Sequence, residues 1–141
     1  GKTTESLVTY LRNSLLQEGG FNNEKIAEEQ VVEAVNFDIH FVKTVEGHRH
    51  IERITEIIPF EDDESDAKDL IASMERYFKQ KNRRHVYKTV DIVRFENGAY
   101  KYKNPISRKS IKNITYHLSY EEQIKFQEFL GKFPDRKEAI S

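Results

Sequence analysis

Residues 37–58 read FDIHFVKTVEGHRHIERITEII, and their pattern is typical of two β-strands. Apolar and polar residues alternate before and after the sequence VEGH, which is the period of a β-strand. A two-residue turn at Glu46-Gly47 therefore predicts a hairpin. In that register one face carries Phe37, Ile39, Phe41 and Ile54, and the other face pairs Val42 with Ile51. Both faces carry apolar side chains, which is typical of a sheet covered on two sides.

Two amphipathic helices are predicted before this hairpin. Residues 4–17 have helical spacing and end at Gly19-Gly20, and either Asn22 or Asn23 can cap a second helix that ends near Asn36. The apolar positions of the first helix are Leu7, Val8, Leu11 and Leu15. Those of the second are Ile26, Ala27, Val31, Ala34 and Val35.

A helix, a second hairpin and two short helices are predicted after residue 58. The acidic run EDDESD (61–66) leads into the helix, and Asn97-Gly98 favours a tight turn between VDIVRF and YKYK, which Asn104-Pro105 ends. The helix stripe comprises Ala67, Leu70, Ile71, Met74, Tyr77 and Phe78. The closing helices carry Ile111, Ile114 and Leu118, then a capping box Ser119-x-x-Glu122 followed by Ile124, Phe129, Leu130 and Phe133.

Composition limits the classes of function. The chain has 141 residues, the size of one domain or a large piece of one, and is 37% hydrophobic and 33% charged with a net charge of −1. No global field therefore attracts nucleic acid or an acidic membrane. The absence of cysteine excludes disulfides and cysteine–zinc sites. That absence of cysteine agrees with a cytoplasmic origin. No apolar run approaches the roughly 20 residues of a membrane span, so we expect no membrane insertion.

The first four residues, Gly1-Lys2-Thr3-Thr4, match the end of a phosphate-binding P-loop. That loop also needs a preceding strand and a glycine five residues before the Gly-Lys pair, so that backbone N–H groups can surround the phosphates. Neither precedes Gly1. We therefore interpret Lys2 as a terminal lysine and not as part of a nucleotide site.

Two clusters of polar residues each have two interpretations. His48, His50 and Glu52 alternate along one strand, with His40 expected on the opposite face, which is compatible with three metal ligands or with exposed hairpin polarity. A basic cluster near three tyrosines could bind single-stranded nucleic acid, form an ordinary basic helix end and guarded edge strand, or dock a protein. It comprises Lys79, Lys81, Arg83, Arg84 and Lys88, with Tyr87, Tyr100 and Tyr102. We predict no specific nucleic-acid binding.

Several motifs around the first hairpin resemble a known family. A helix with Glu29-Gln30 precedes the strand 37–42, a glycine turn follows at Gly47, and the next strand reads RITEI (53–57). The segment TVDIVRFENGAYKYKNPIS (89–107) is similar to a tail in which a hairpin ends in Asn-Pro before a closing helix. The chain thus resembles the C-terminal part of type II/type IV secretion (traffic) ATPases, nearest the tight-adherence pilus and conjugation branches.

The resemblance implies an α/β fold, the C-terminal fragment of a RecA-like P-loop ATPase domain with helices packed on hairpins. It implies one C-terminal subdomain over 1–141, in which 1–58 end the ATPase core and 59–141 add the C-terminal helix, hairpin and helices. The parent enzyme would bind ATP and Mg²⁺, form a homo-hexamer, and contact an inner-membrane platform protein at the cytoplasmic face. The Walker and histidine boxes have no counterpart here, so the resemblance implies that this chain alone holds no cofactor and is inactive. A stand-alone adaptor that binds protein or nucleic acid is the alternative.

Arg53 and Glu56 match charged positions of the family's Arg-x-x-Glu-Ile strand. In the parent enzyme this strand packs near subunit contacts, so the resemblance implies either a subunit contact or a structural role. Charges that alternate on a half-exposed strand favour the structural role.

Overall fold

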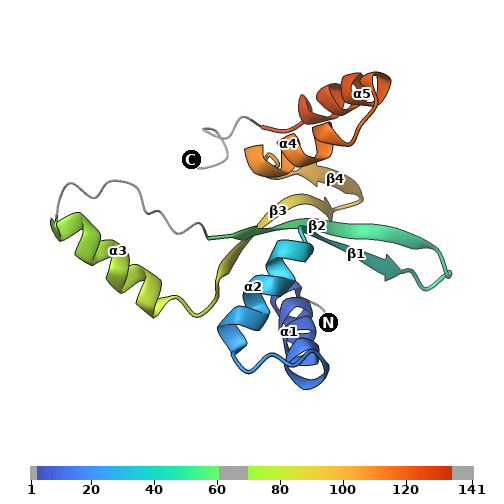
Figure 1. Cartoon of the computed structure of the whole chain (residues 1–141). Helices are drawn as coiled ribbons and strands as arrows, with labels where there is room; N and C mark the ends of the chain where they lie inside the picture. The colour runs from blue at the N-terminus through green and yellow to red at the C-terminus, as the bar shows by residue number, and fades with distance from the viewer. Residues whose placement is uncertain (1–2, 61–69, 135–141) are drawn as a thin grey trace.

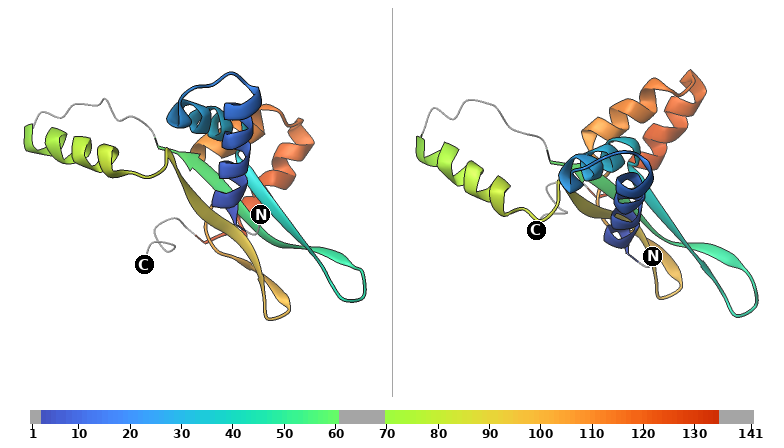
Figure 2. Two further views of the ribbon diagram at one scale, coloured as in Figure 1. Left: turned by 90° about the horizontal axis from the view of Figure 1, so that it is seen from below. Right: turned by 60° about the horizontal axis from the view of Figure 1, so that its bottom comes forward.

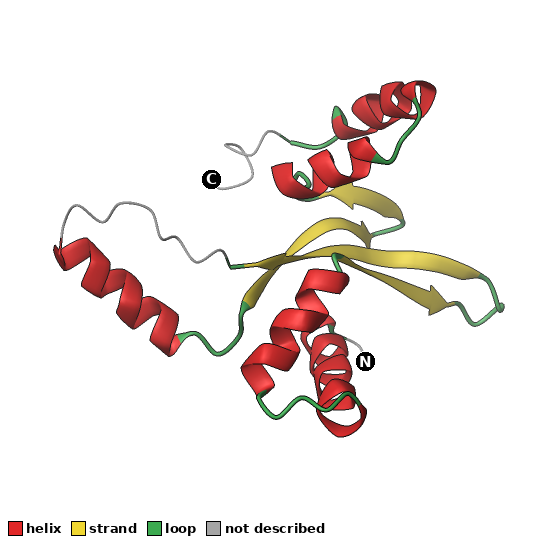
Figure 3. Ribbon diagram, in the orientation of Figure 1, coloured by secondary structure: helices red, strands yellow, loops and turns green. Residues whose placement is uncertain are grey.

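Four antiparallel strands lie side by side in chain order at the centre of the computed structural model, which describes residues 3–60 and 70–134 (Figures 1 and 3). The strands are β1 (Phe37–Lys43), β2 (Arg49–Pro59), β3 (Tyr87–Glu96) and β4 (Ala99–Tyr102). The mixed class of helices on a sheet, predicted from the sequence, is confirmed. The described sheet is wholly antiparallel.

Helices α1 (Thr4–Glu18) and α2 (Glu24–Ala34) cover one face of the sheet. Asn23 caps α2, as one of the two predicted choices, because its side chain accepts from the backbone N–H groups of Lys25 and Ile26. The core on this face comprises Val8, Val31, Val32, Ile57 and Tyr87. The predicted stripe of α2 was wrong in part: Ile26 is 48% exposed, and Val32 is buried instead.

Helices α4 (Arg108–Tyr116) and α5 (Tyr120–Leu130) cover the other face (Figure 1). The core there is formed by Ile92, Val93, Ile106 and Phe133, with Phe37 and Ile54 packed against it. The predicted capping box is confirmed, since Ser119 and Glu122 bond reciprocally at the start of α5. The inner part of the sheet is thus covered on both faces, as the first hairpin predicted, whereas Ile39 and Phe41 in the outer part of that hairpin are 48% and 57% exposed.

The two hairpins differ in how well their register was predicted. At Asn97-Gly98 both residues have positive φ angles, 52° and 79°, and Glu96 pairs with Ala99, so the tight turn is confirmed. The first hairpin was wrong at its tip: Phe41 pairs with Ile51 and Val42 with His50. A longer loop closed between Thr44 and His48 shifts the register by one residue, and an irregularity between His40 and Phe41 restores the predicted pairing of Ile39 with Ile54.

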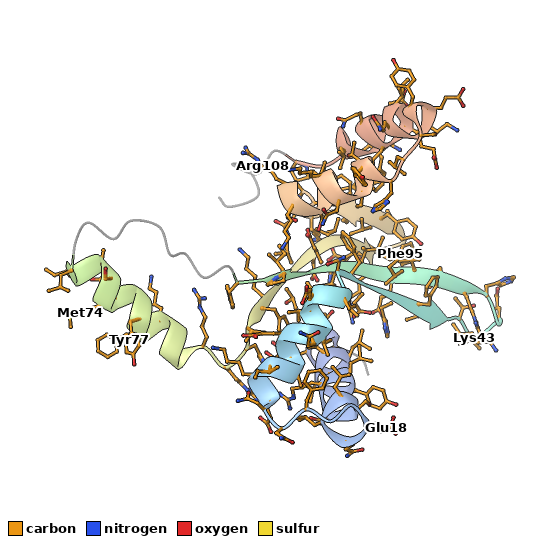
Figure 4. The ribbon with its side chains drawn as sticks, in the orientation of Figure 1. Glu18, Lys43, Met74, Tyr77, Phe95 and Arg108 are labelled. Carbon is orange, nitrogen blue, oxygen red and sulfur yellow. The ribbon has the colours of Figure 1, made fainter. Side chains whose placement is uncertain are left out.

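Helix α3 (Leu70–Asn82) stands apart from both layers in all the views (Figures 1 and 2). Its predicted apolar stripe is present but exposed, with Leu70 at 75%, Met74 at 50% and Tyr77 at 60%. Met74 and Tyr77 project from the helix into open space (Figure 4). Ala67 and the acidic run 61–66 lie outside the described residues.

Candidate functional site

Arg53 lies at the centre of a buried network that joins α1 to the sheet. Its Nη1 lies 2.9 Å from Asp38 Oδ2, 2.8 Å from Thr4 Oγ1 and 3.0 Å from Thr55 Oγ1, so its two hydrogens are shared among three acceptors. Thr4 Oγ1 in turn donates to Asp38 Oδ2 at 2.8 Å. The Arg53 and Asp38 side chains are only 7% and 11% exposed. A buried charge is tolerated when it is paired and hydrogen-bonded, so this network fixes the start of α1 against β1 and β2.

Glu56 has a similar part on the opposite face of β2. Its residue is 1% exposed, and its carboxylate accepts from the Ser107 N–H at 2.8 Å, from Ser107 Oγ at 2.5 Å and from Ser110 Oγ at 2.7 Å. Ser107 is the N-cap of α4, so the negative charge lies where the helix dipole favours it. Glu56 therefore anchors the first turn of α4 to the centre of the sheet.

A third buried acid, Glu28 of α2, was missed by the sequence reasoning. It is 4% exposed and accepts from the Val86 N–H at 2.8 Å, while Arg12 Nη1 lies 3.3 Å and His85 Nδ1 3.2 Å from Oε2. Its spacing of three residues from Val31 and four from Val32 puts it on their helical face, and this was the available signal, since an acid inside an apolar stripe implies a buried partner. The partners come from α1 and from the segment before β3, which sequence periodicity does not bring together.

Tyr87 lies beside this acid and has a buried hydroxyl. Within the described ranges that oxygen has no hydrogen-bond partner. Burial, and next the negative charge of Glu28, raise the pKa of Tyr87 to about 12. The tyrosine is therefore a core residue and presents no ring for stacking against a base.

The hydroxyls of the GKTT sequence are used within the fold. Thr3 caps α1, because its Oγ1 accepts from the Ser6 N–H at 3.1 Å, and Thr4 belongs to the Arg53 network. Lys2 lies outside the described residues. The geometry of Thr3 and Thr4 is that of a helix start.

The three candidate metal ligands do not converge. Glu52 lies 3.4 Å from His40, whereas the ring of His50 packs on Phe95 with centroids 4.8 Å apart. His40 was expected on the opposite face from Glu52, and this was wrong because the strand irregularity beside Glu52 reverses the alternation. In the part of the chain that the structure describes, no group of three suitable side chains could hold a metal ion.

The fold separates two tyrosines, Tyr100 and Tyr102, from the rest of the predicted basic cluster. Tyr100 and Tyr102 lie on β4 and pack on Phe95 and Phe133, far along the sheet from the buried Tyr87. The side chain of Lys81 is outside the described residues. The predicted aromatic and basic surface for single-stranded nucleic acid is therefore not assembled by these residues.

The structure instead brings Arg83, Arg84 and Lys88 into one groove with Arg108 and Lys109 of α4. The groove has a volume of about 1360 Å³. Its floor is formed by Ile57, Ile58 and Pro59 at the end of β2 and by Phe60, and α2 lines it with Glu24, Lys25, Glu29 and Glu33. Figure 4 shows Arg108 at the first turn of α4, on the side of the sheet where β2 ends. Sequence reasoning missed Arg108 and Lys109 because only the tertiary fold brings them to the segment 83–88.

Comparison of the chain with family models, curated proteins and solved structures finds no match. Over residues 3–60 and 70–134, no helix is long and apolar enough to cross a membrane.

Proposed function

We propose that this chain is the C-terminal subdomain of a hexameric secretion or pilus-assembly ATPase, with a structural and partner-contacting role. The proposal begins from the resemblance of residues 29–57 and 89–107 to that family. In it, residues 1–58, which include β1 and most of β2, end a RecA-like ATPase core, and residues 59–141 add the C-terminal helix, hairpin and helices. ATP hydrolysis by the parent protein powers secretion, pilus assembly or conjugation.

The observation that carries the proposal is the position of the two motif charges on β2. Arg53 bonds to Thr4 and Asp38 on one face, and Glu56 bonds to Ser107 and Ser110 on the other. Both side chains are buried and bonded within the chain. They therefore fit a structural role, in which each attaches one helical layer to β2. A subunit contact through either side chain would require an opening of these networks.

The proposal assigns ATP and Mg²⁺ to the parent protein and none to this chain alone. Phosphoryl transfer needs a backbone cradle, a lysine, a magnesium-binding hydroxyl and a carboxylate held together. The hydroxyls of Thr3 and Thr4 serve the start of α1 instead. The partners in this proposal are the other subunits of a homo-hexamer and an inner-membrane platform protein, which places the parent at the cytoplasmic face of the inner membrane.

An extended protein tests the proposal. The coding sequence upstream of residue 1 is expressed together with the chain, and ATP turnover is measured in both forms. We expect turnover only in the extended form, with loss of turnover when its P-loop lysine is replaced. A natural start codon at residue 1, with no P-loop upstream, would refute the proposal.

The second candidate is a stand-alone adaptor that binds another macromolecule, and the exposed stripe of α3 favours it. Leu70, Met74, Tyr77 and Phe78 are each at least 50% exposed on one helix. Exposed apolar patches of this kind mark contact surfaces. The upstream sequence separates the candidates, because an adaptor needs no P-loop.

A further inference from the structure

Besides Lys25 of α2, five cations that line the groove between α2 and α4 have no ion-pair partner within residues 3–60 and 70–134. They come from two segments far apart in the sequence: Arg83, Arg84, Lys88, Arg108 and Lys109. All five are exposed, and none forms a salt bridge with another described residue. In contrast, Arg12, Arg53, Arg94 and Lys103 are all paired with acids. In a chain of net charge −1, such a concentration of unpaired positive charge at one groove is a local feature.

Two of these cations occupy a position that the helix itself disfavours. Arg108 and Lys109 are the first two residues of α4, whose first turn has no acidic residue. The positive end of the helix dipole repels cations, and acids are favoured there. Glu56 offsets part of this cost from beneath, where it accepts from Ser107 and Ser110. An anionic ligand in the groove would relieve the remaining repulsion, which gives these two residues a reason to be present.

Arg83 is held in place before any ligand arrives. Its guanidinium carbon lies 3.9 Å from the centre of the Phe60 ring, a cation–π contact on the groove floor. Less side-chain entropy is therefore lost when Arg83 binds an anion. Beside it, Ile58 and Pro59 offer apolar surface on the same floor.

The acids that line the groove limit the chemistry of the ligand. Glu24, Glu29 and Glu33 of α2 belong to the same lining as the cations, together with Lys25. A nucleic acid would bring its phosphates close to these carboxylates, and Tyr87 is buried and cannot stack on a base. A protein segment can turn its acidic side chains toward the cations, its apolar side chains to the floor, and neutral or basic side chains toward α2. A volume of about 1360 Å³ exceeds the usual range for a small-molecule pocket and suits a peptide.

We propose that this groove binds an acidic segment of a partner protein, through Arg83, Arg84 and Lys88 on one side and Arg108 and Lys109 on the other. The inference rests on the cations and the groove alone. It holds whether or not the chain belongs to a secretion ATPase.

Fluorescence anisotropy with a labelled peptide tests the proposal. The probe is about a dozen residues long, with glutamates alternating with leucine and phenylalanine, and its control has glutamine in place of every glutamate. We expect the acidic peptide to bind at least tenfold more tightly than the control, and less tightly as salt rises from about 50 to 200 mM. Equal affinity for the two peptides would overturn the proposal.

Matched charge variants locate the site. Arg83→Gln/Arg84→Gln and Arg108→Gln/Lys109→Gln should each weaken binding of the acidic peptide about threefold to tenfold. Lys125→Gln/Lys132→Gln removes the same charge from exposed positions of α5 and the following turn, and should change the affinity less than twofold. An equal loss in all three variants would show non-specific attraction and overturn the proposal.

Two further measurements guard against misleading outcomes. Backbone amide NMR shifts should change on peptide addition at residues 83–88 and 108–113, and changes confined to other regions would contradict the assignment. A single-stranded oligothymidine of similar length and label should bind more weakly than the acidic peptide. Tighter binding of the oligonucleotide, lost in the same two groove variants, would replace the peptide with nucleic acid and overturn the proposal.

Discussion

Replacement of Arg53 by methionine should destabilise the chain strongly. The substitution keeps most of the side-chain volume but removes the cation that Asp38, a residue 9% exposed, faces at 2.9 Å. Thr4 Oγ1 also loses the donor that bonds it at 2.8 Å. When one partner of a buried ion pair is removed, the other remains as an uncompensated buried charge, at a cost of about 3–5 kcal/mol.

This cost corresponds to a large shift of the melting temperature. The entropy of unfolding is about 2.1 cal/mol/K per residue, or roughly 0.3 kcal/mol/K for a chain of this length. A loss of about 3–5 kcal/mol therefore lowers the melting temperature by about 10–17 °C. The double variant Asp38→Leu/Arg53→Met should recover more than half of this loss, because apolar replacements of a buried pair are often tolerated.

Thermal and urea unfolding followed by circular dichroism measure both effects. Arg94→Met is the matched control, because its partner Asp91 lies at a similar 2.9 Å but the two side chains are 45% and 38% exposed. That control should cost less than about 1 kcal/mol. An Arg53→Met protein that melts like the wild type but no longer self-associates would contradict the structural role and assign Arg53 to a subunit contact.

Three further outcomes are expected from single substitutions. Glu56→Ala should lower the free energy of unfolding by about 2–4 kcal/mol, because Ser107 and Ser110 lose a buried charged acceptor. Hydrogen exchange should then show faster opening of α4. Unchanged exchange in α4 would contradict the anchoring role of Glu56. Tyr87→Phe should be neutral or stabilising, since it removes a buried hydroxyl without a partner among the described residues. Because burial raises the pKa of Tyr87 from the ordinary value of about 10 to about 12, the free energy of unfolding of the wild type should fall between these two pH values. Tyr87→Phe should flatten that part of the stability–pH curve. An unchanged slope would be inconsistent with a buried phenol. Gly98→Val should cost about 1–2 kcal/mol in urea unfolding, because φ is 79° there, and a neutral result would argue against the tight turn.

The periodic parts of the chain were predictable from local physics. Alternation of apolar and polar residues predicted both hairpins. Asn97-Gly98 predicted its tight turn because few residues accept two positive φ angles, and the capping box of Ser119 and Glu122 predicted the start of α5. The error at the tip of the first hairpin arose from one extra residue in the loop. The irregularity at Glu52 compensates for that residue, and no local sequence signal distinguishes the predicted register from the observed one.

The candidate site was less predictable because its contacts are long-range. Arg108 follows Arg83 by 25 positions in the sequence, and only the docking of α4 on the sheet brings both to one groove. Glu28 lies within an apolar stripe of α2, but its partner His85 follows it by 57 positions in the sequence, after β1 and β2. Tyr100 and Tyr102 were grouped with Tyr87 by composition, and the strand direction separates them.

ATP turnover of the chain and of its upstream-extended form, measured side by side, tests the central proposal most directly. The chain alone should show neither magnesium-dependent turnover nor a change of melting temperature with millimolar ATP. If ATP is present at about 100 times its dissociation constant, its binding stabilises the folded chain by about 2.7 kcal/mol, so such a site would raise the melting temperature measurably. The extended form should turn over ATP and lose this activity when its P-loop lysine is replaced. Magnesium-dependent turnover by the chain alone, persisting through further purification, or an extended form without any turnover, would contradict the account.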